Sequence, residues 1–258
     1  MFDRDFLSAA LSDTPLSLLL FSSIDSTNTE ARRYALGGGS APALFLAEEQ
    51  TAGRGRMGRS FFSPKDTGIY LSLLCKSDDL SSDPITVTSA AAVAVYRAIR
   101  SVTGISVGIK WVNDLYYEGK KICGILAESF FVGEERFFIV GVGLNLSTVD
   151  FPSDLRDKAG SLFSENTELS DTLCAALAHE LYALVTEGRP EEFMKDYRAA
   201  SLVLGAPVTY RKNDVERQAV AESVDDLGRL LVRHSDGTTD LLASGEISLR
   251  IHDKGEII

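Results

Sequence analysis

The segment G-R-G-R-M-G-R, residues 53–59, packs three arginines and three glycines into seven positions of a chain whose formal net charge is −11. Glycines at alternate positions let the backbone approach a ligand closely, and arginine side chains are forked donors that match carboxylate and phosphate oxygens. Apolar runs predict strands on both sides, at residues 43–48 and 69–75. The segment therefore predicts an anion-binding loop between two strands, with a solvated basic turn as the alternative.

Length and composition indicate a folded protein of 258 residues with room for one large domain and a small one. The acidic balance argues against a general nucleic-acid or membrane-surface binder, because such proteins carry a basic face. The three cysteines lack the spacing of a disulfide framework or a zinc site, so we expect buried thiols in a reducing compartment. We find no membrane-spanning run and no secretory leader and expect a cytoplasmic protein.

Short polar residues stand before a helix near the start of the main domain. A strand expected at residues 16–22 leads into Ser26, Thr27 and Asn28, and a helix follows at residues 29–36. These residue types are good N-caps. A helix N-terminus with free N–H groups also binds carbonyl or anionic groups, so the two roles are compatible.

The residues that follow the arginine loop include two adjacent aromatics, Phe61 and Phe62. At least one of them could offer a flat face to a purine ring, and packing in the core is the equally weighted alternative.

A second polar concentration lies at residues 110–128, K-W-V-N-D-L-Y-Y-E-G-K-K-I-C-G-I-L-A-E. Asn113 and Asp114 follow a strand, a hairpin turn is predicted beyond them, and Lys121 begins the next apolar run. A lysine at the start of a buried strand is costly unless it meets an anion. The alternative is that Lys120 and Lys121 are both exposed turn residues.

A third motif, Gly141, Val142 and Gly143 followed by Asn145, ends the hydrophobic run at residues 137–146. Glycine inside a strand often marks close approach of another backbone or a ligand. Taken alone, the pair of glycines is a weak signal, and a β-bulge is the alternative.

The C-terminal part changes from helical to alternating patterns. An alanine- and valine-rich helix is expected at residues 87–100. Further helices are expected at residues 171–187, with Ser170 as the N-cap, and at residues 191–200. Short strands follow at residues 208–211, 219–224, 229–234, 239–242 and 246–251. We therefore divide the chain into a domain at residues 1–204, expected to hold the site, and a small all-β domain at residues 205–258.

Five motifs in order resemble the bacterial biotin protein ligases. They are S-T-N at residues 26–28, Q-x-A-G-R-G-R-x-G-R at 50–59, K-W-x-N-D with K-K-x-x-G-I-L at 110–126, G-x-G-x-N at 141–145 and G-E-I-S-L-R at 245–250. The resemblance runs from about residue 18 to the C-terminus. It implies an α+β fold, with a mixed β-sheet and packed helices as in class II aminoacyl-tRNA synthetases, and a small C-terminal SH3-like β-barrel domain.

Two features depart from the family pattern. Val112 stands where the family usually has proline. This substitution affects the rigidity of the backbone more than the chemistry, because the polar residues around it, Lys110, Asn113 and Asp114, are kept. The residues before the first strand are too few for the helix-turn-helix domain of relatives that repress transcription. We therefore expect a monofunctional ligase with no DNA partner.

The resemblance implies two steps: biotin and Mg-ATP form biotinyl-5′-AMP, and a lysine of a biotin carboxyl carrier protein then takes the biotinyl group. Lys121, Arg54 and Arg56 are the catalytic cations it implies, and Asp114 is a weak, water-mediated Mg²⁺ contact. The biotin-binding positions it implies are Ser26, Thr27, Asn28, Gln50, Gly53, Arg54, Gly55, Arg56, Lys121 and Gly124. The implied nucleotide-binding positions are Arg59, Phe61, Asn113, Gly143 and Asn145.

Two alternatives to this function remain. One is a lipoate- or octanoate-type protein ligase, although the R-R-x-x-G-G-G motif of the lipoate enzymes is absent. The other is a non-catalytic biotin sensor, which would not require the full set of cationic residues. Relatives form homodimers through the sheet of the central domain, so a homodimer is a further expectation.

Overall fold

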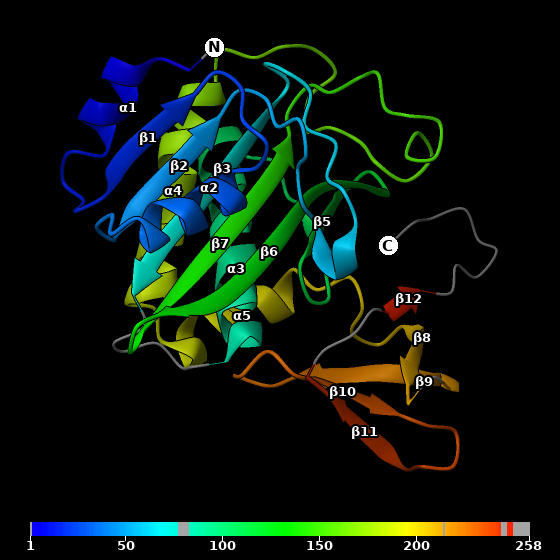
Figure 1. The fold of residues 1–258 in the computed structure, drawn as a ribbon. Coiled ribbons are helices and arrows are strands. Elements are labelled where there is room, and N and C mark those ends of the chain that lie inside the picture. Colours follow the sequence, from blue (N-terminus) through cyan, green and yellow to red (C-terminus); the bar gives the residue numbers. More distant parts are fainter. Residues whose placement is uncertain (1, 77–82, 214, 244–246, 250–258) are drawn as a thin grey trace.

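The computed structural model describes residues 2–76, 83–213, 215–243 and 247–249. Its centre is a seven-stranded sheet in the order β1-β2-β3-β7-β6-β5-β4, seen across Figure 1. β1 and β2 are parallel and the other neighbours are antiparallel. The strands are β1 (Ser17–Phe21), β2 (Ala43–Ala47), β3 (Gly68–Lys76), β4 (Gly108–Lys110), β5 (Asp114–Tyr117), β6 (Lys120–Val132) and β7 (Glu135–Asn145). The predicted mixed sheet is therefore confirmed.

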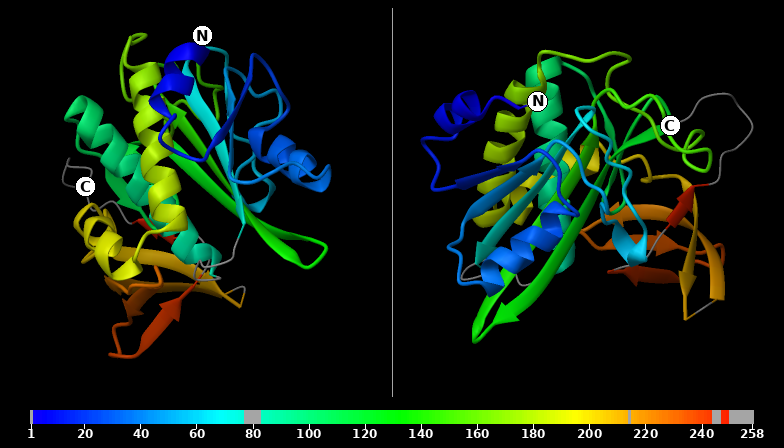
Figure 2. Two further views of the ribbon diagram at one scale, coloured as in Figure 1. Left: turned by 90° about the vertical axis from the view of Figure 1, so that its left-hand side faces the viewer. Right: turned by 45° about the horizontal axis from the view of Figure 1, so that its top comes forward.

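Helices cover both faces of this sheet unequally. α3 (Pro84–Thr103) and α4 (Ser170–Thr186) lie on one face with α1 (Arg4–Ala10) beside α4, and α2 (Thr27–Leu36) lies on the other face (Figure 2). α5 (Pro190–Ala199) packs against α3. The face that carries only α2 is partly open, and the cavity described below lies on this face.

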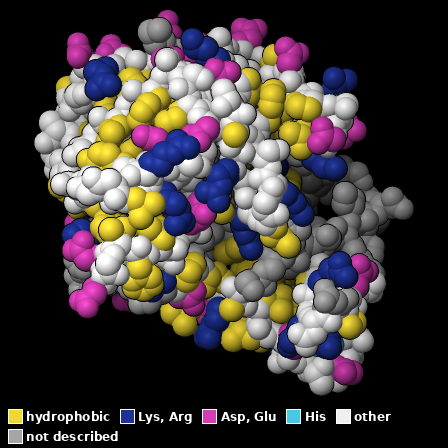
Figure 3. All heavy atoms as spheres, viewed as in Figure 1, with side chains coloured by type: hydrophobic (Ala, Val, Ile, Leu, Met, Phe, Trp, Pro, Cys, Tyr) yellow, Lys and Arg dark blue, Asp and Glu magenta, His cyan; other side chains and the backbone are white. Residues whose placement is uncertain are grey.

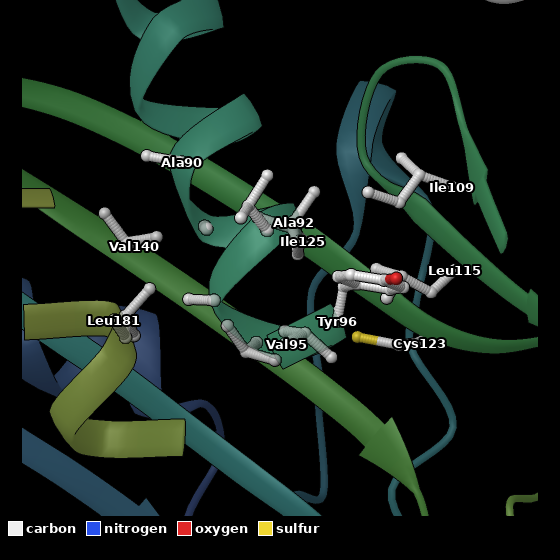
Figure 4. Packing of buried hydrophobic residues seen from close by; sticks show 14 of the residues in the cluster. Ala90, Ala92, Val95, Tyr96, Ile109, Leu115, Cys123, Ile125, Val140 and Leu181 are labelled. Atoms are coloured by element: carbon white, nitrogen blue, oxygen red, sulfur yellow. The ribbon is translucent and has the colours of Figure 1, made fainter. Parts of the chain in front are cut away.

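Small side chains let α3 approach the sheet closely. Figure 4 shows Ala90 and Ala92 of α3 in one buried cluster with Ile125 and Val140 of the sheet and Leu181 of α4. Burying side chains of the size of Ile125 or Val140 contributes about 1.5–3 kcal/mol each. This core makes the sheet a rigid support for loops on its other face.

Helix starts follow local capping rules with one correction. The Asp83 side chain accepts a hydrogen bond from the backbone N–H of Ile85, so α3 begins earlier than sequence patterns predict. The prediction that Ser170 caps α4 is wrong, because Leu169 is the N-cap and Ser170 is the first helical residue. The Ser170 hydroxyl instead donates to the carbonyl of Thr167.

A second, five-stranded antiparallel sheet has the order β11-β10-β9-β8-β12, consistent with the predicted SH3-like domain. Its strands are β8 (Pro207–Lys212), β9 (Val215–Val224), β10 (Leu230–Arg233), β11 (Thr239–Leu242) and β12 (Ile247–Leu249). Of the motif at residues 245–250, positions 245, 246 and 250 lie outside the described residues. None of the helices in the described ranges is both long and apolar enough to span a bilayer.

One turn of this C-terminal unit contacts the larger one near the site. The indole Nε1 of Trp111 donates to the carbonyl of Gly228 at 2.8 Å, and the Thr86 hydroxyl donates to the carbonyl of Leu227 at 3.0 Å. The peptide bond between Trp111 and Val112 is cis. Trp111 also lines the cavity described below, so it connects this turn to that cavity.

Candidate functional site

A cavity of about 400 Å³ lies on the open face of the sheet, between the arginine loop, the start of α2 and strands β3, β6 and β7. Segments far apart in the sequence supply its wall. Of the residues predicted from sequence, the lining includes Ser26, Thr27, Asn28, Gln50, Arg54, Gly55, Arg56, Arg59, Phe61, Asn113, Asp114, Lys121, Gly124, Gly143 and Asn145. Gly53 is not among the residues that line the cavity. A glycine is required at this position for a structural reason, because a Cβ there would lie 2.4 Å from the carbonyl oxygen of Phe61.

A hydrogen-bond network closes one end of the cavity. The Gln50 Oε1 accepts from the backbone N–H of Thr27 at 2.9 Å and from its hydroxyl at 3.1 Å, while Gln50 Nε2 donates to Ser63 at 2.9 Å. Ser72 Oγ lies 2.7 Å from Thr27 Oγ1 and 2.6 Å from Asn28 Oδ1. These bonds hold the side chains in fixed orientations.

Ser26 is the N-cap of α2, but its side chain makes no capping hydrogen bond. Helix capping and ligand binding were the two roles left open for residues 26–28. The backbone of Ser26 is at the N-cap position, but the buried side chains of Thr27 and Asn28 contact Gln50 and the neighbouring strands instead of the N–H groups of the helix.

Glycines form the floor of the cavity. A Cβ on Gly141 would lie 2.0 Å from Asn28 Oδ1, and one on Gly143 would lie 2.5 Å from the Phe61 ring. Pairing of β7 with β3 and β6 continues through both glycines without a shift, so the bulge alternative is wrong. The two glycines instead make room for the side chains of Asn28 and Phe61 against the sheet. Phe61 covers the floor next to Gly124, whose Cβ would lie 3.4 Å from its ring.

Cationic side chains also line the cavity. The Lys121 Nζ lies 2.7 Å from Asp114 Oδ1, and Arg56 Nη1 donates to Asn113 Oδ1 at 2.7 Å. Arg54 pairs with Glu128 through two bonds of 2.9 Å. Figure 3 shows Lys and Arg side chains gathered near the centre of this face, in a chain that is acidic overall. Such a cluster stabilises anions, and the alternative that Lys121 is a plain turn residue does not fit its ion pair.

Two asparagines present polar atoms at the wall beside Phe61. Asn113 Nδ2 donates to the carbonyl of Ile125 at 3.0 Å, and Asn145 Nδ2 donates to the carbonyl of Gly160 at 3.1 Å. Asn145 Oδ1 is buried and has no donor among the described residues. A buried acceptor without a partner is costly, so this oxygen suits an N–H group of a ligand.

Burial disfavours the ionised form of two thiols on the central sheet, and neither is among the described residues that line the cavity. Burial raises the pKa of the Cys75 thiol to about 12 and raises the pKa of Cys123 above its usual range. Thiols of this kind stay protonated at neutral pH and are inert. The polar groups that line the cavity are hydrogen-bonding side chains, cationic side chains and Asp114.

Three contributors to the site were not among the predicted residues: Ser63, Ser72 and Glu128. Ser72 had a signal in the sequence, because it is a hydroxyl residue in the middle of an apolar strand. Glu128 closes the second polar concentration, yet nothing in its local pattern indicates that it meets Arg54, which is 74 positions away.

The chain belongs to the biotin/lipoate A/B protein ligase family, whose model matches residues 20–145. Within that family it is similar to biotin ligases. It is 34% identical over 227 residues to the bifunctional ligase/repressor BirA of Bacillus spizizenii. The matched region covers 83% of this chain and 68% of that protein. It is 30% identical to the biotin–[acetyl-CoA-carboxylase] ligase of Mycobacterium tuberculosis, over 86% of this chain and 85% of that one.

Among solved structures, the fold is similar to the biotin protein ligase from Aquifex aeolicus in complex with biotin and ATP. The TM-score is 0.76 at 25% identity, with 91% of this chain and 98% of that chain covered. The resemblance drawn from the five motifs is confirmed by these comparisons.

Proposed function

We propose that this chain is an ATP-dependent biotin protein ligase, which forms biotinyl-5′-AMP and transfers the biotinyl group to a lysine of a biotin carboxyl carrier protein. The observation that carries the proposal is the combination of two groups of residues in a single cavity. Its lining includes both an oriented hydrogen-bond network around Thr27 and Gln50 and a set of cations, Lys121 and the arginines of the loop. Such a cavity suits a ligand with a polar ring at one end and a carboxylate at the other.

The ring end has the donors that a ureido group requires. Gln50 uses its carbonyl oxygen on Thr27 and one N–H on Ser63, so its second N–H remains for a ligand. The Ser26 hydroxyl, which is not spent on a cap, can both donate and accept. We assign Ser26, Thr27 and Gln50 to the ureido ring on these grounds.

At the cationic end, a carboxylate oxygen of biotin would attack the α-phosphorus of ATP. The bond from that phosphorus to the bridging oxygen breaks, and pyrophosphate leaves. Two anions must approach each other, so positioned positive charge is the main catalytic requirement. We assign Lys121 to the carboxylate and α-phosphate, Arg54 and Arg56 to the acyl-phosphate region and Arg59 to the leaving pyrophosphate.

In the second step the acceptor amine attacks the acyl carbon of the mixed anhydride, an amide bond forms and AMP leaves. A protein lysine reaches the carbonyl only from solvent, and the cavity is open on this face of the sheet. A carrier domain that presents its lysine on an exposed turn fits this opening. We propose that this acceptor belongs to a carboxylase and that the reaction takes place in the cytoplasm.

The nucleotide is assigned to the floor beside the cations. Phe61 lies over Gly143 and Gly124 and lines the cavity, so its ring can stack on adenine. The buried Oδ1 of Asn145, for which the described part of the chain offers no donor, suits the exocyclic amine of that base. Asn113, already bonded to Arg56, would hold the arginine toward the phosphates.

Magnesium would enter on the phosphates of ATP, as this ion often does. Asp114 is the carboxylate in the cavity lining, and Lys121 already neutralises it at 2.7 Å. The described residues also contain no group of three His, Cys, Asp or Glu side chains that could form a metal site. We therefore assign Asp114 at most a water-mediated contact to the ion.

Biotin-dependent exchange of labelled pyrophosphate into ATP tests the proposal directly. We expect exchange with biotin and not with lipoate, and we expect Lys121→Ala to lower the rate by about 10²- to 10³-fold, as loss of a positioned charge does. Lys120→Ala is the matched control, because its Nζ donates to the carbonyl of Arg156 outside this cavity. Exchange with lipoate would favour the second ligase class, and binding of biotin without exchange would favour a sensor.

A homodimer can be tested in the same preparations. β1 is one edge of the seven-stranded sheet, so its outer hydrogen-bonding groups are available for a second chain. Size-exclusion chromatography with light scattering, with and without biotin and ATP, measures the oligomeric state.

A further inference from the structure

Glu128 of β6 joins the two ends of the cavity, although it lies 74 positions from the arginine loop and 100 from the start of α2. Its Oε1 accepts from Arg54 Nη2 at 2.9 Å, and its Oε2 accepts from Arg54 Nη1 and from Asn28 Nδ2, each at 2.9 Å. Arg32 lies 3.9 Å from Oε1. The carboxylate is 18% exposed, so it is largely shielded from water.

A carboxylate in this position needs an explanation. Successive residues of a strand point to opposite faces, so Glu128 shares its face with Gly124 and with Phe130, which belongs to an apolar cluster. A charge on such a face is unfavourable unless several donors surround it. Donors from the loop and from α2 meet this requirement together, which makes Glu128 a fixed point between two elements that do not pair with each other.

The geometry also leaves Arg54 able to bind a ligand. A two-bond pair of guanidinium and carboxylate fixes the plane of the guanidinium group as well as its position. Arginine has five N–H donors, and the pair uses two of them. Glu128 therefore holds Arg54 in a defined orientation while three donors remain.

We propose that Glu128 is a positioning residue for the adenylation step. It sets Arg54 in the cavity wall and, through Asn28, aligns the arginine loop with the residues assigned to the ureido ring. The proposal rests on the function proposed above. It extends the site by a residue that touches neither substrate and acts through Arg54.

The first test compares Glu128→Gln with the wild type in pyrophosphate exchange and in biotin binding. Glutamine can still accept from Asn28 but faces Arg54 with an amide, so the guanidinium loses its fixed plane. We expect the maximal exchange rate to fall about 10- to 100-fold, as misplacement of a catalytic group does. The dissociation constant for biotin should change less than the rate does.

Glu135→Gln is the matched control. Glu135 lies on β7, the hairpin partner of the same strand, and forms an ion pair of 2.6 Å with Lys76. Neither residue is among the described residues that line the cavity. It should exchange like the wild type. A purely structural role for Glu128 predicts lowered thermal stability with rate and binding reduced together.

A double-mutant cycle gives the sharper readout. If Glu128 acts through Arg54, then Glu128→Gln has no further effect on the exchange rate in an Arg54→Ala background. Independent, multiplying losses would overturn the proposal. So would wild-type exchange by Glu128→Gln in a protein that is otherwise active.

Limited trypsin digestion of the ligand-free protein reports on the loop without any activity. Trypsin cuts after the arginines of the loop, so Glu128→Gln should be cut there several-fold faster than the wild type or Glu135→Gln. Equal cutting overturns the role of Glu128 in holding the loop. If the wild type shows no exchange with biotin, the proposed function fails and the catalytic part of this proposal fails with it, while the digestion still measures the hold on the loop.

Discussion

Gly141→Ala should destabilise the protein through a single side chain on another element. The added Cβ would lie 2.0 Å from Asn28 Oδ1 and 2.8 Å from Asn28 Cγ, which is closer than real Cβ contacts come. Backbone pairing on both sides holds the strand in place, so Asn28 must leave its position. It is 4% exposed, and leaving its position breaks the hydrogen bonds that it makes there.

The magnitude follows from those partners. Asn28 donates to the Glu128 carboxylate, a bond to a charged group worth about 1.5–3 kcal/mol, and lies 2.6 Å from Ser72 Oγ, a neutral bond worth about 0.5–1.5 kcal/mol. Alanine is favoured over glycine within a strand by about 0.5–1 kcal/mol, which opposes the loss. The net decrease in the free energy of unfolding is therefore about 1–4 kcal/mol.

Urea unfolding followed by circular dichroism measures this loss, and a thermal midpoint about 2–4 °C lower per kcal/mol accompanies it. Gly124→Ala is the control on the neighbouring strand, because its Cβ would lie 3.3 Å from the flexible end of Lys121 and 3.4 Å from the Phe61 ring. We also expect Gly141→Ala to weaken biotin binding about tenfold or more, since each 1.4 kcal/mol is a factor of ten. A variant with wild-type stability and wild-type biotin affinity would refute the reasoning about Gly141.

Three further predictions concern other parts of the molecule. Trp111→Phe removes the hydrogen bond to Gly228 and should lower the thermal midpoint by a few degrees, since an intramolecular bond of this kind contributes about 0.5–1.5 kcal/mol; calorimetry measures the change, and an unchanged midpoint would contradict it. Hydrogen bonds from Lys212 and Tyr210 lower the pKa of Asp240, so the stability that this group contributes should be present above the unfolded pKa of about 4 and be lost as the pH falls toward the folded value; urea titrations at several pH values should show this acid-side loss in the wild type and a smaller one in Asp240→Asn. All three cysteines are buried, and burial raises the pKa of each thiol, to about 12 for Cys75. None of them should therefore react with iodoacetamide in the native protein at pH 8, and rapid labelling before unfolding would show that this burial is wrong.

Much of the architecture could be predicted from local patterns. The strands at residues 16–22, 43–48 and 69–75 correspond to β1, β2 and β3, because apolar runs bounded by turn residues have few other stable conformations. The Ala- and Val-rich segment became α3, longer at both ends than predicted. The family was likewise accessible, because five motifs with constrained spacing leave little room for coincidence.

The chemical types at the site also followed from the sequence. Alternating glycine and arginine in residues 53–59 indicates an anion-binding loop, since closely spaced flexible backbone and forked cations have that property wherever they occur. Lys121 was selected because an unpaired lysine at the start of a buried strand would be unfavourable, and in the structure it pairs with Asp114.

The pairings across the site required the tertiary structure. Asn28 lies over Gly141 and donates to Glu128, and Phe61 lies over Gly143, although these residues come from separate elements. A sequence pattern reports the environment that a residue needs within its own helix or strand. Which distant residue supplies that environment depends on strand order and register, and these are decided by how all the strands and helices bury their apolar faces together.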